Sequence, residues 1–260
     1  MDRSNIEKIA RTPEDKMLLA KVWDKINTGI RKNIPSNSCF LSPRELEMTR
    51  FLFGDCEGLY PFGGYEAAER KMLVFLPEYL EESALYEDAP LVCLRATFYQ
   101  GDSPNHRDFL GALMGAGIAR EAVGDICVGN GSCDFFVINE IAPYILQNFE
   151  SAGRTKLHLQ EIPLSEVRVP EPETKELKDT LASLRLDSLI SAGFRIGRSQ
   201  AAQYVTAGKV AINGLPWEKP DKIIKEGAVI SVRGLGKIRL TTVGGQTKKG
   251  RISVVIHRYV

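Results

Sequence analysis

The chain has 260 residues, of which 43% are hydrophobic and 26% charged, which is ordinary for a soluble globular protein and long enough for two or three domains. Its five cysteines are odd in number, scattered and without a CxxC pair, so they fit neither a disulfide framework nor a zinc site. No apolar run approaches the roughly 18 residues of a membrane span, and the N-terminal residues mix both charges, so we expect a cytoplasmic protein without membrane insertion.

The formal net charge of +1 conceals a division of charge along the chain. From Ser183 onward there are 14 Lys and Arg against 4 Asp and Glu, whereas the first 182 residues hold 20 against 29. A basic module joined to an acidic body indicates an anionic polymer or surface as the partner of the C-terminal part.

Residues 1–85 are predicted to form a helical domain with a small amount of strand. Thr12 and Pro13, followed by two carboxylates, are typical of a helix start, because the hydroxyl caps the helix and the acids face the positive end of its dipole. Ser42 and Glu45 form the pattern of a capping box at the start of a second helix. An apolar strand is predicted at residues 72–76, closed by Pro77.

Residues 86–165 show a different periodicity. Strands are predicted at 91–99, 125–128, 133–139 and 157–162, and helices at 106–116 and 140–151. This order, βαββαβ, is that of a ferredoxin-like sheet, which RNA-recognition motifs share. The third strand lacks the basic, glycine and spaced-aromatic pattern that stacks bases, so we expect Phe135 and Phe136 to be core or dimer-facing residues.

Residues 166–182 are rich in proline and acid and are predicted to be a linker to a C-terminal domain at 183–260. That domain begins with two short helices, Arg185 to Ala192 and Arg198 to Ala207, each ending at a glycine, Gly193 or Gly208, that can take the left-handed cap conformation. A strand at 209–212 then leads into Asn213-Gly214, a dipeptide that favours a tight hairpin turn. The whole chain is thus an α+β protein in three parts.

Cationic and polar side chains fall between the apolar ones in this domain, so that one face can pack while the other meets phosphate. A basic loop of Gly244-Gly245 and Lys248 to Arg251 is predicted before the last strand, 252–256, and is expected to reach phosphates without reading bases. The candidate RNA-binding residues are Arg185, Arg195, Arg198, Ser199, Gln200 and Lys209 from the helical side, and Lys237, Arg239, Lys248, Lys249 and Arg251 from the hairpin side.

No constellation for catalysis, a metal or a cofactor is evident. The glycines at 111–117 lack the GxGxxG order that cradles a pyrophosphate, and the three histidines have no metal spacing. The triplet around Asp187, RLD, also occurs around the catalytic aspartate of some pseudouridine synthases, but the Thr-Ser-Gly segment that follows it there is absent. We therefore expect Asp187 to be a structural partner of a nearby cation such as Arg195 or Arg198.

Residues 183–236 resemble an S4 domain, an RNA-binding module, through RLDxxI and GRSQAAxxVxxGxVxxNG. The usual Ser-Arg at the second helix start is Gly197-Arg198 here, which keeps the cation. The segments FGGYEAAERK, at 62–71, and HRDFLGALMGAGIAREAVGDI, at 106–126, are similar to those of the YlmH-type bacterial proteins. That family is described as an N-terminal region, an RNA-recognition-like domain and a C-terminal S4 domain, and some of its genes lie in cell-division clusters.

The resemblance implies a non-catalytic protein that binds rRNA and tRNA on the large ribosomal subunit during quality control of stalled peptidyl-tRNA. Two alternatives stay open from the sequence. One is an RNA-modifying enzyme, a pseudouridine synthase or methyltransferase, anchored by its S4 domain. The other is a division-related scaffold whose acidic N-terminal body binds ribosomal or division proteins.

Overall fold

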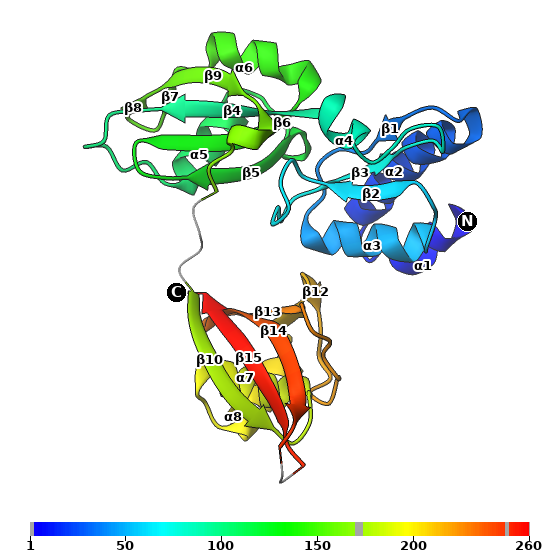
Figure 1. The fold of residues 1–260 in the computed structure, drawn as a ribbon, viewed down its shortest axis with the longest axis vertical. Coiled ribbons are helices and arrows are strands. Elements are labelled where there is room, and N and C mark those ends of the chain that lie inside the picture. Colours follow the sequence, from blue (N-terminus) through cyan, green and yellow to red (C-terminus); the bar gives the residue numbers. More distant parts are fainter. Residues whose placement is uncertain (1–2, 170–173, 248–249, 260) are drawn as a thin grey trace. The chain divides into compact units, whose positions relative to one another are not determined.

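The computed structural model describes residues 3–169, 174–247 and 250–259. Its contacts divide the chain into two units, residues 1–170 and 171–260 (Figure 1). The boundary predicted at residue 85 lies inside the first of these units.

The N-terminal part of the first unit is mostly helical, as predicted. Thr12 accepts a hydrogen bond from the amide of Asp15 at the start of α2, and Ser42 and Glu45 form the capping box of α3. The helices are η1 (Arg3–Asn5), α1 (Ile6–Ile9), α2 (Pro13–Lys32), α3 (Pro43–Phe53) and α4 (Ala84–Glu87). Strands β1 (Ser36–Asn37), β2 (Leu59–Phe62) and β3 (Met72–Phe75) form an antiparallel sheet in the order β1-β3-β2.

The rest of the first unit confirms the predicted βαββαβ order. Its elements are β4 (Leu91–Thr97), α5 (His106–Gly115), β5 (Val123–Val128), β6 (Ser132–Ile138), α6 (Ala142–Asn148) and β9 (His158–Ile162). The strands pair antiparallel in the order β5-β6-β4-β9, which is the ferredoxin-like arrangement. Smaller elements join them: η2 (Arg120–Ala122), η3 (Asn139–Ile141), η4 (Leu164–Glu166) and the hairpin of β7 (Ser151–Ala152) and β8 (Thr155–Lys156).

Both faces of this four-stranded sheet are covered by protein. On one face Phe135 packs with Phe109 of α5 and Ile145 of α6. On the other face Phe136 packs with Phe40 and with Met72 of β3, so the N-terminal part and the sheet share a core. The side chains of Phe135 and Phe136 are fully buried, which confirms that they are core residues.

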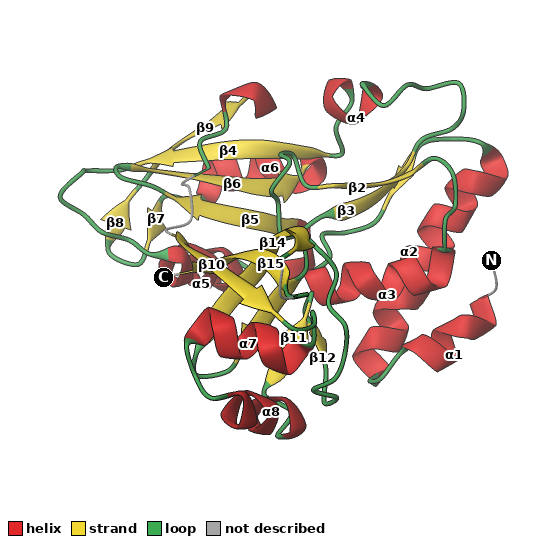
Figure 2. Ribbon diagram, turned by 60° about the horizontal axis from the view of Figure 1, so that its bottom comes forward, coloured by secondary structure: helices red, strands yellow, loops and turns green. Residues whose placement is uncertain are grey.

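The second unit places two helices on one face of a six-stranded antiparallel sheet (Figure 2). The helices are α7 (Leu186–Phe194) and α8 (Arg198–Thr206). The strands are β10 (Thr174–Leu181), β11 (Val210–Ile212), β12 (Leu215–Pro216), β13 (Val229–Val232), β14 (Gly236–Gln246) and β15 (Ile252–Tyr259), in the order β10-β15-β14-β13-β11-β12. Asn213 and Gly214 both have positive φ, as predicted for the hairpin turn.

The structure corrects the predicted linker at 166–182. Residues 174–181 form β10, which pairs antiparallel with β15 along its whole length. The alternating Leu177 and Leu181 face the core of this unit, and this burial outweighs the linker-like composition of the segment. The predicted basic loop is also shorter than expected, because β14 continues through Gly244 and Gly245 with an irregular register.

The first helix of this unit does not end at Gly193. That glycine is buried inside α7, and a Cβ there would lie 2.7 Å from the Ile238 side chain, so glycine serves close packing of the helix on the sheet. Arg195, with φ of 55°, takes the left-handed cap position instead. Gly208, with φ of 66°, follows α8 as predicted.

Candidate nucleic-acid interface

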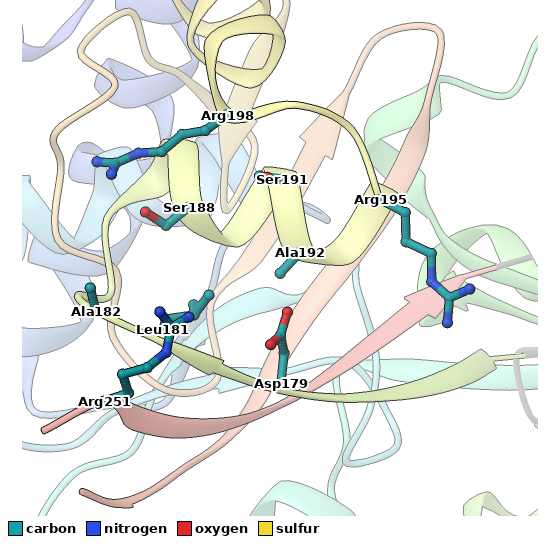
Figure 3. A pocket seen from close by; sticks show the side chains of 9 residues that line it. All are labelled: Asp179, Leu181, Ala182, Ser188, Ser191, Ala192, Arg195, Arg198 and Arg251. Carbon is teal, nitrogen blue, oxygen red and sulfur yellow. The ribbon is translucent and has the colours of Figure 1, made fainter. Parts of the chain in front are cut away.

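A cavity of about 400 Å³ opens between α7 and β10 (Figure 3). Three arginines line it together with hydroxyl, apolar and acidic side chains; its residues are Asp179, Leu181, Ala182, Ser188, Ser191, Ala192, Arg195, Arg198 and Arg251. Two cavities of the first unit have mixed polar and apolar linings. The lining of the cavity of about 430 Å³ includes one cationic side chain, and that of the cavity of about 220 Å³ includes none. The cavity of the second unit is therefore the better candidate for an anionic ligand.

Each arginine reaches this cavity from a different element. Arg195 extends from the left-handed cap of α7, and Arg198 is the first residue of α8. Arg251 stands just before β15 and donates from Nε to the Thr180 carbonyl at 3.1 Å, with a second hydrogen bond from Nη2 to the same oxygen. These hydrogen bonds hold Arg251 to β10, on the strand side of the cavity.

Asp187 fixes two of the predicted cations. It is 4% exposed and accepts hydrogen bonds from Nε of Arg185 at 3.2 Å and Nε of Arg198 at 3.1 Å, with Ser188 Oγ at 3.3 Å. Burial alone would raise the pKa of Asp187, but the two guanidinium groups outweigh it and hold that pKa below its ordinary value. Among the described residues its ion-pair partners are Arg185 and Arg198, so of the two expected partners Arg198 is found and Arg195 is not.

The remaining predicted residues divide between two faces of the sheet. Ser199, Gln200 and Lys209 are exposed on the helical side, with Lys209 Nζ 5.6 Å from the centroid of the Tyr204 ring. Lys237 and Arg239 lie on the opposite face, because they alternate along β14 with Ile238 and Leu240, which are each 1% exposed and face the core. The predicted Lys248 and Lys249 lie outside the described residues.

The ferredoxin-like sheet of the first unit does not present a free face for base stacking. Where an RNA-recognition motif exposes its two central strands, Arg95 of β4 and Asp134 of β6 form a buried ion pair through two hydrogen bonds of 2.7 Å. Arg95 also donates to the Glu166 carbonyl, and Asp134 accepts from the Arg168 amide. Sequence reasoning missed this pair, although one charge in each otherwise apolar strand was the available signal.

The two segments that carry the family resemblance meet beside this sheet. Asp125 of β5 accepts hydrogen bonds from the Tyr65 hydroxyl at 2.8 Å and from the amides of Glu69 and Arg70. Gly64 has φ of +87°, and a Cβ there would lie 2.5 Å from the Phe136 ring. These contacts join the N-terminal part to the sheet. The residues that make them, in both segments, therefore have a structural role.

The described residues include no group of three His, Cys, Asp or Glu placed to hold a metal ion. Within the same residues, no helix is long and apolar enough to cross a membrane. Cys93, Cys127 and Cys133 are buried, and burial raises the pKa of Cys127 to about 11, so at neutral pH it is an unreactive thiol.

Two short helices on an antiparallel sheet, with arginines gathered where the helices begin and end, define an RNA-binding module of the S4 type. Residues 184–230 match the S4 domain model, and residues 102–166 match the model described as a putative RNA-binding domain in YlmH. The chain is 35% identical over 222 residues to the ribosome-associated protein quality control protein P2 of Bacillus subtilis (strain 168), an alignment that covers 84% of this chain and 85% of that protein. The chain therefore belongs to the YlmH family, which confirms the resemblance seen in the sequence.

A solved structure supports the fold. The cell division protein ylmH from Streptococcus pneumoniae superimposes with a TM-score of 0.51 at 18% identity, covering 62% of this chain and 98% of that one.

Proposed function

We propose that this protein binds rRNA and tRNA on the large ribosomal subunit and acts, without catalysis of its own, in quality control of stalled peptidyl-tRNA complexes. The name of the Bacillus subtilis relative and the two RNA-binding domain matches support a role at the ribosome. The observation that carries the proposal is that three arginines, Arg195, Arg198 and Arg251, line one cavity of the second unit.

Guanidinium groups suit this task because they donate paired hydrogen bonds to phosphate oxygens and stay charged at any physiological pH. Ser188 and Ser191 supply hydroxyl groups at the same cavity. Asp187 orients Arg198 and restricts its side chain before RNA arrives, which reduces the entropy lost on binding.

Filter binding with tRNA and co-sedimentation with large subunits test this proposal. The Arg195→Ala/Arg198→Ala variant should bind both more weakly, and the slope of log affinity against log salt should fall by about 0.7 to 0.9 for each phosphate that the protein no longer neutralises. Lys25→Ala/Arg31→Ala, which removes two exposed cations of α2, is a control matched in charge. A folded Arg195→Ala/Arg198→Ala protein with undiminished, salt-insensitive binding would overturn the proposal.

The absence of catalysis is tested separately. Asp187 is the residue with a likeness to a catalytic group, and its carboxylate is already engaged by Arg185 and Arg198. RNA incubated with the protein should contain no additional pseudouridine. Pseudouridine formation that disappears in Asp187→Asn would establish the enzyme alternative instead.

A further inference from the structure

One carboxylate stands among the arginines of the cavity. Asp179 of β10 pairs in register with Val254, which is 1% exposed and faces the core, so Asp179 lies on the helix side of the sheet. Figure 3 shows its carboxylate rising from β10 toward Ala192 of α7, between Arg195 and Arg251. Among the described residues no salt bridge joins Asp179 to these arginines, and its hydrogen bond is with the Thr180 amide at 2.6 Å.

A carboxylate weakens a site that binds phosphate alone, since the two negative charges repel. It accepts hydrogen bonds and donates none, so it favours a ligand that also presents N–H or O–H groups. RNA presents such groups on its bases and as the 2′-hydroxyl. The apolar side chains of Leu181, Ala182 and Ala192 line the same cavity and offer contact to the flat face of a base.

We infer that the cavity binds one unpaired nucleotide of the RNA, with phosphate at the arginines and the donor edge of the base at Asp179. Guanine is the preferred base, because its adjacent N1–H and exocyclic amino groups can donate to both oxygens of one carboxylate. The base must be unpaired, since the same groups are used in Watson–Crick pairing. This inference rests on the proposed function and adds to it a selectivity for sequence.

The strand that supplies this selectivity lies outside the S4 match. The family model covers residues 184–230, whereas Asp179 belongs to β10 and Arg251 precedes β15. The two helices of the module therefore form one wall of the cavity, and the paired strands around the module form the other. The recognition is thus a property of the whole second unit.

The test uses the full chain and four hairpin RNAs with one stem and a loop that differs at a single nucleotide: guanosine, inosine, adenosine or uridine. Inosine keeps N1–H and lacks the exocyclic amino group. Fluorescence anisotropy at one salt concentration should show the guanosine loop bound roughly tenfold more tightly than the uridine loop, with inosine between them. The Asp179→Asn variant should bind all four with similar affinity, and more tightly than the wild type binds uridine, because a negative charge is removed.

Glu176→Gln is the matched control. Glu176 is an exposed carboxylate of the same strand, but its register partner is His257 on the face away from the helices. This variant should keep the preference for guanosine. Asp179 is exposed, so Asp179→Asn should also keep the thermal midpoint of the wild type.

Equal binding of the four RNAs by the wild type would overturn the inference, as would a preference for guanosine that survives in Asp179→Asn. Neither result affects the proposed function, which depends on affinity for all four RNAs. Failure of the proposed function appears instead as undiminished binding of every RNA by Arg195→Ala/Arg198→Ala.

Discussion

Arg195 occupies a backbone conformation that side chains rarely adopt. With φ of 55° it ends α7 in the left-handed region, where glycine avoids a steric cost of about 1 kcal/mol or more. Arginine at this position makes the fold less stable than glycine would, but it places a guanidinium group at the cavity. We expect Arg195→Gly to raise the free energy of unfolding by about 1 kcal/mol and to lower RNA affinity, as measured by urea denaturation and filter binding.

Arg195→Ala separates the two effects. Alanine keeps the strained backbone and removes the guanidinium group, so RNA affinity should fall as in Arg195→Gly while stability stays near the wild-type value. If Arg195→Gly were less stable than the wild type, the arginine side chain would be making a stabilising contact and the argument from strain would fail.

Asp15 connects the first two long helices through charge. It is 4% exposed on α2 and accepts two hydrogen bonds from Arg44 of α3, one of them 2.8 Å long, and a third from the Arg11 amide. The Arg44 hydrogen bonds lower the pKa of Asp15, against the opposing effect of burial. Because the pKa of Asp15 is lower in the folded protein than its ordinary value of 3.8, the ionised carboxylate stabilises the fold at pH values above 3.8. This stabilisation is lost as the pH falls through the lowered pKa of the folded protein.

We therefore expect Asp15→Asn to lower the free energy of unfolding by about 1–3 kcal/mol at pH 7, because it removes the charge that Arg44 pairs with. The difference from the wild type should shrink as pH falls below about 4, where the wild-type carboxyl also takes up a proton. Urea denaturation of both proteins in a Trp217→Phe background, where Trp23 of the same helix is the remaining tryptophan, measures both values by fluorescence. A difference that does not change with pH would assign the loss to packing rather than charge.

Two glycines of α5 lower the stability of that helix relative to alanine. Gly111 and Gly115 lie within this helix, and a Cβ at either position would have no neighbour within 4 Å. Glycine in a helix costs roughly 0.5–1 kcal/mol relative to alanine. Gly111→Ala should therefore raise the free energy of unfolding by that amount, and Gly115→Ala by less because it is the last residue of the helix.

Gly64→Ala is the contrasting variant. Its backbone has φ of +87°, and the added methyl group would meet the Phe136 ring at 2.5 Å, so the substitution combines backbone strain with a clash in a shared core. We expect a loss of at least 1 kcal/mol in the same denaturation assay. If Gly64→Ala and Gly111→Ala changed the free energy of unfolding equally, local backbone propensity and not packing would determine the effect of both substitutions.

Elements with local signals were predictable from the sequence, and those fixed by distant contacts were not. The caps at Thr12 and Ser42 and the turn at Asn213 depend on neighbouring residues, so their patterns identify them. Strand β10 depends on pairing with β15 near the other end of the unit, which no local pattern reveals. Gly193 was predicted to be a helix end because nothing in the sequence shows its contact with Ile238.

The candidate site shows the same limit. The sequence identified the cations of the second unit, but it could not assign them to faces, and Lys237 proved to lie on the opposite side of the sheet from Arg195. Asp179 was missed because its strand was predicted to be a linker. Charge composition thus indicated the class of partner, while the arrangement of the cavity required the tertiary structure.

At the scale of the whole molecule, each unit has its own core. The core cluster of the second unit draws all its buried members from residues 181–256, and those of the ferredoxin-like part and its junction come from residues 40–162. Residues 171–260 should therefore fold when expressed alone, with a cooperative thermal transition followed through Trp217, which packs against that core. A fragment without such a transition would show that its core needs the first unit.

The division of charge makes a further prediction about this fragment. Residues 171–260 hold 16 Lys and Arg against 8 Asp and Glu, whereas residues 1–170 hold 18 against 25. Because the net charge of the first unit is negative and disfavours the approach of RNA, the fragment should bind tRNA more tightly than the full chain at low salt, and the difference should fade as salt screens the charges. Filter binding over a salt series measures this. Tighter binding by the full chain at every salt concentration would mean that the first unit makes favourable contacts with RNA that outweigh its charge.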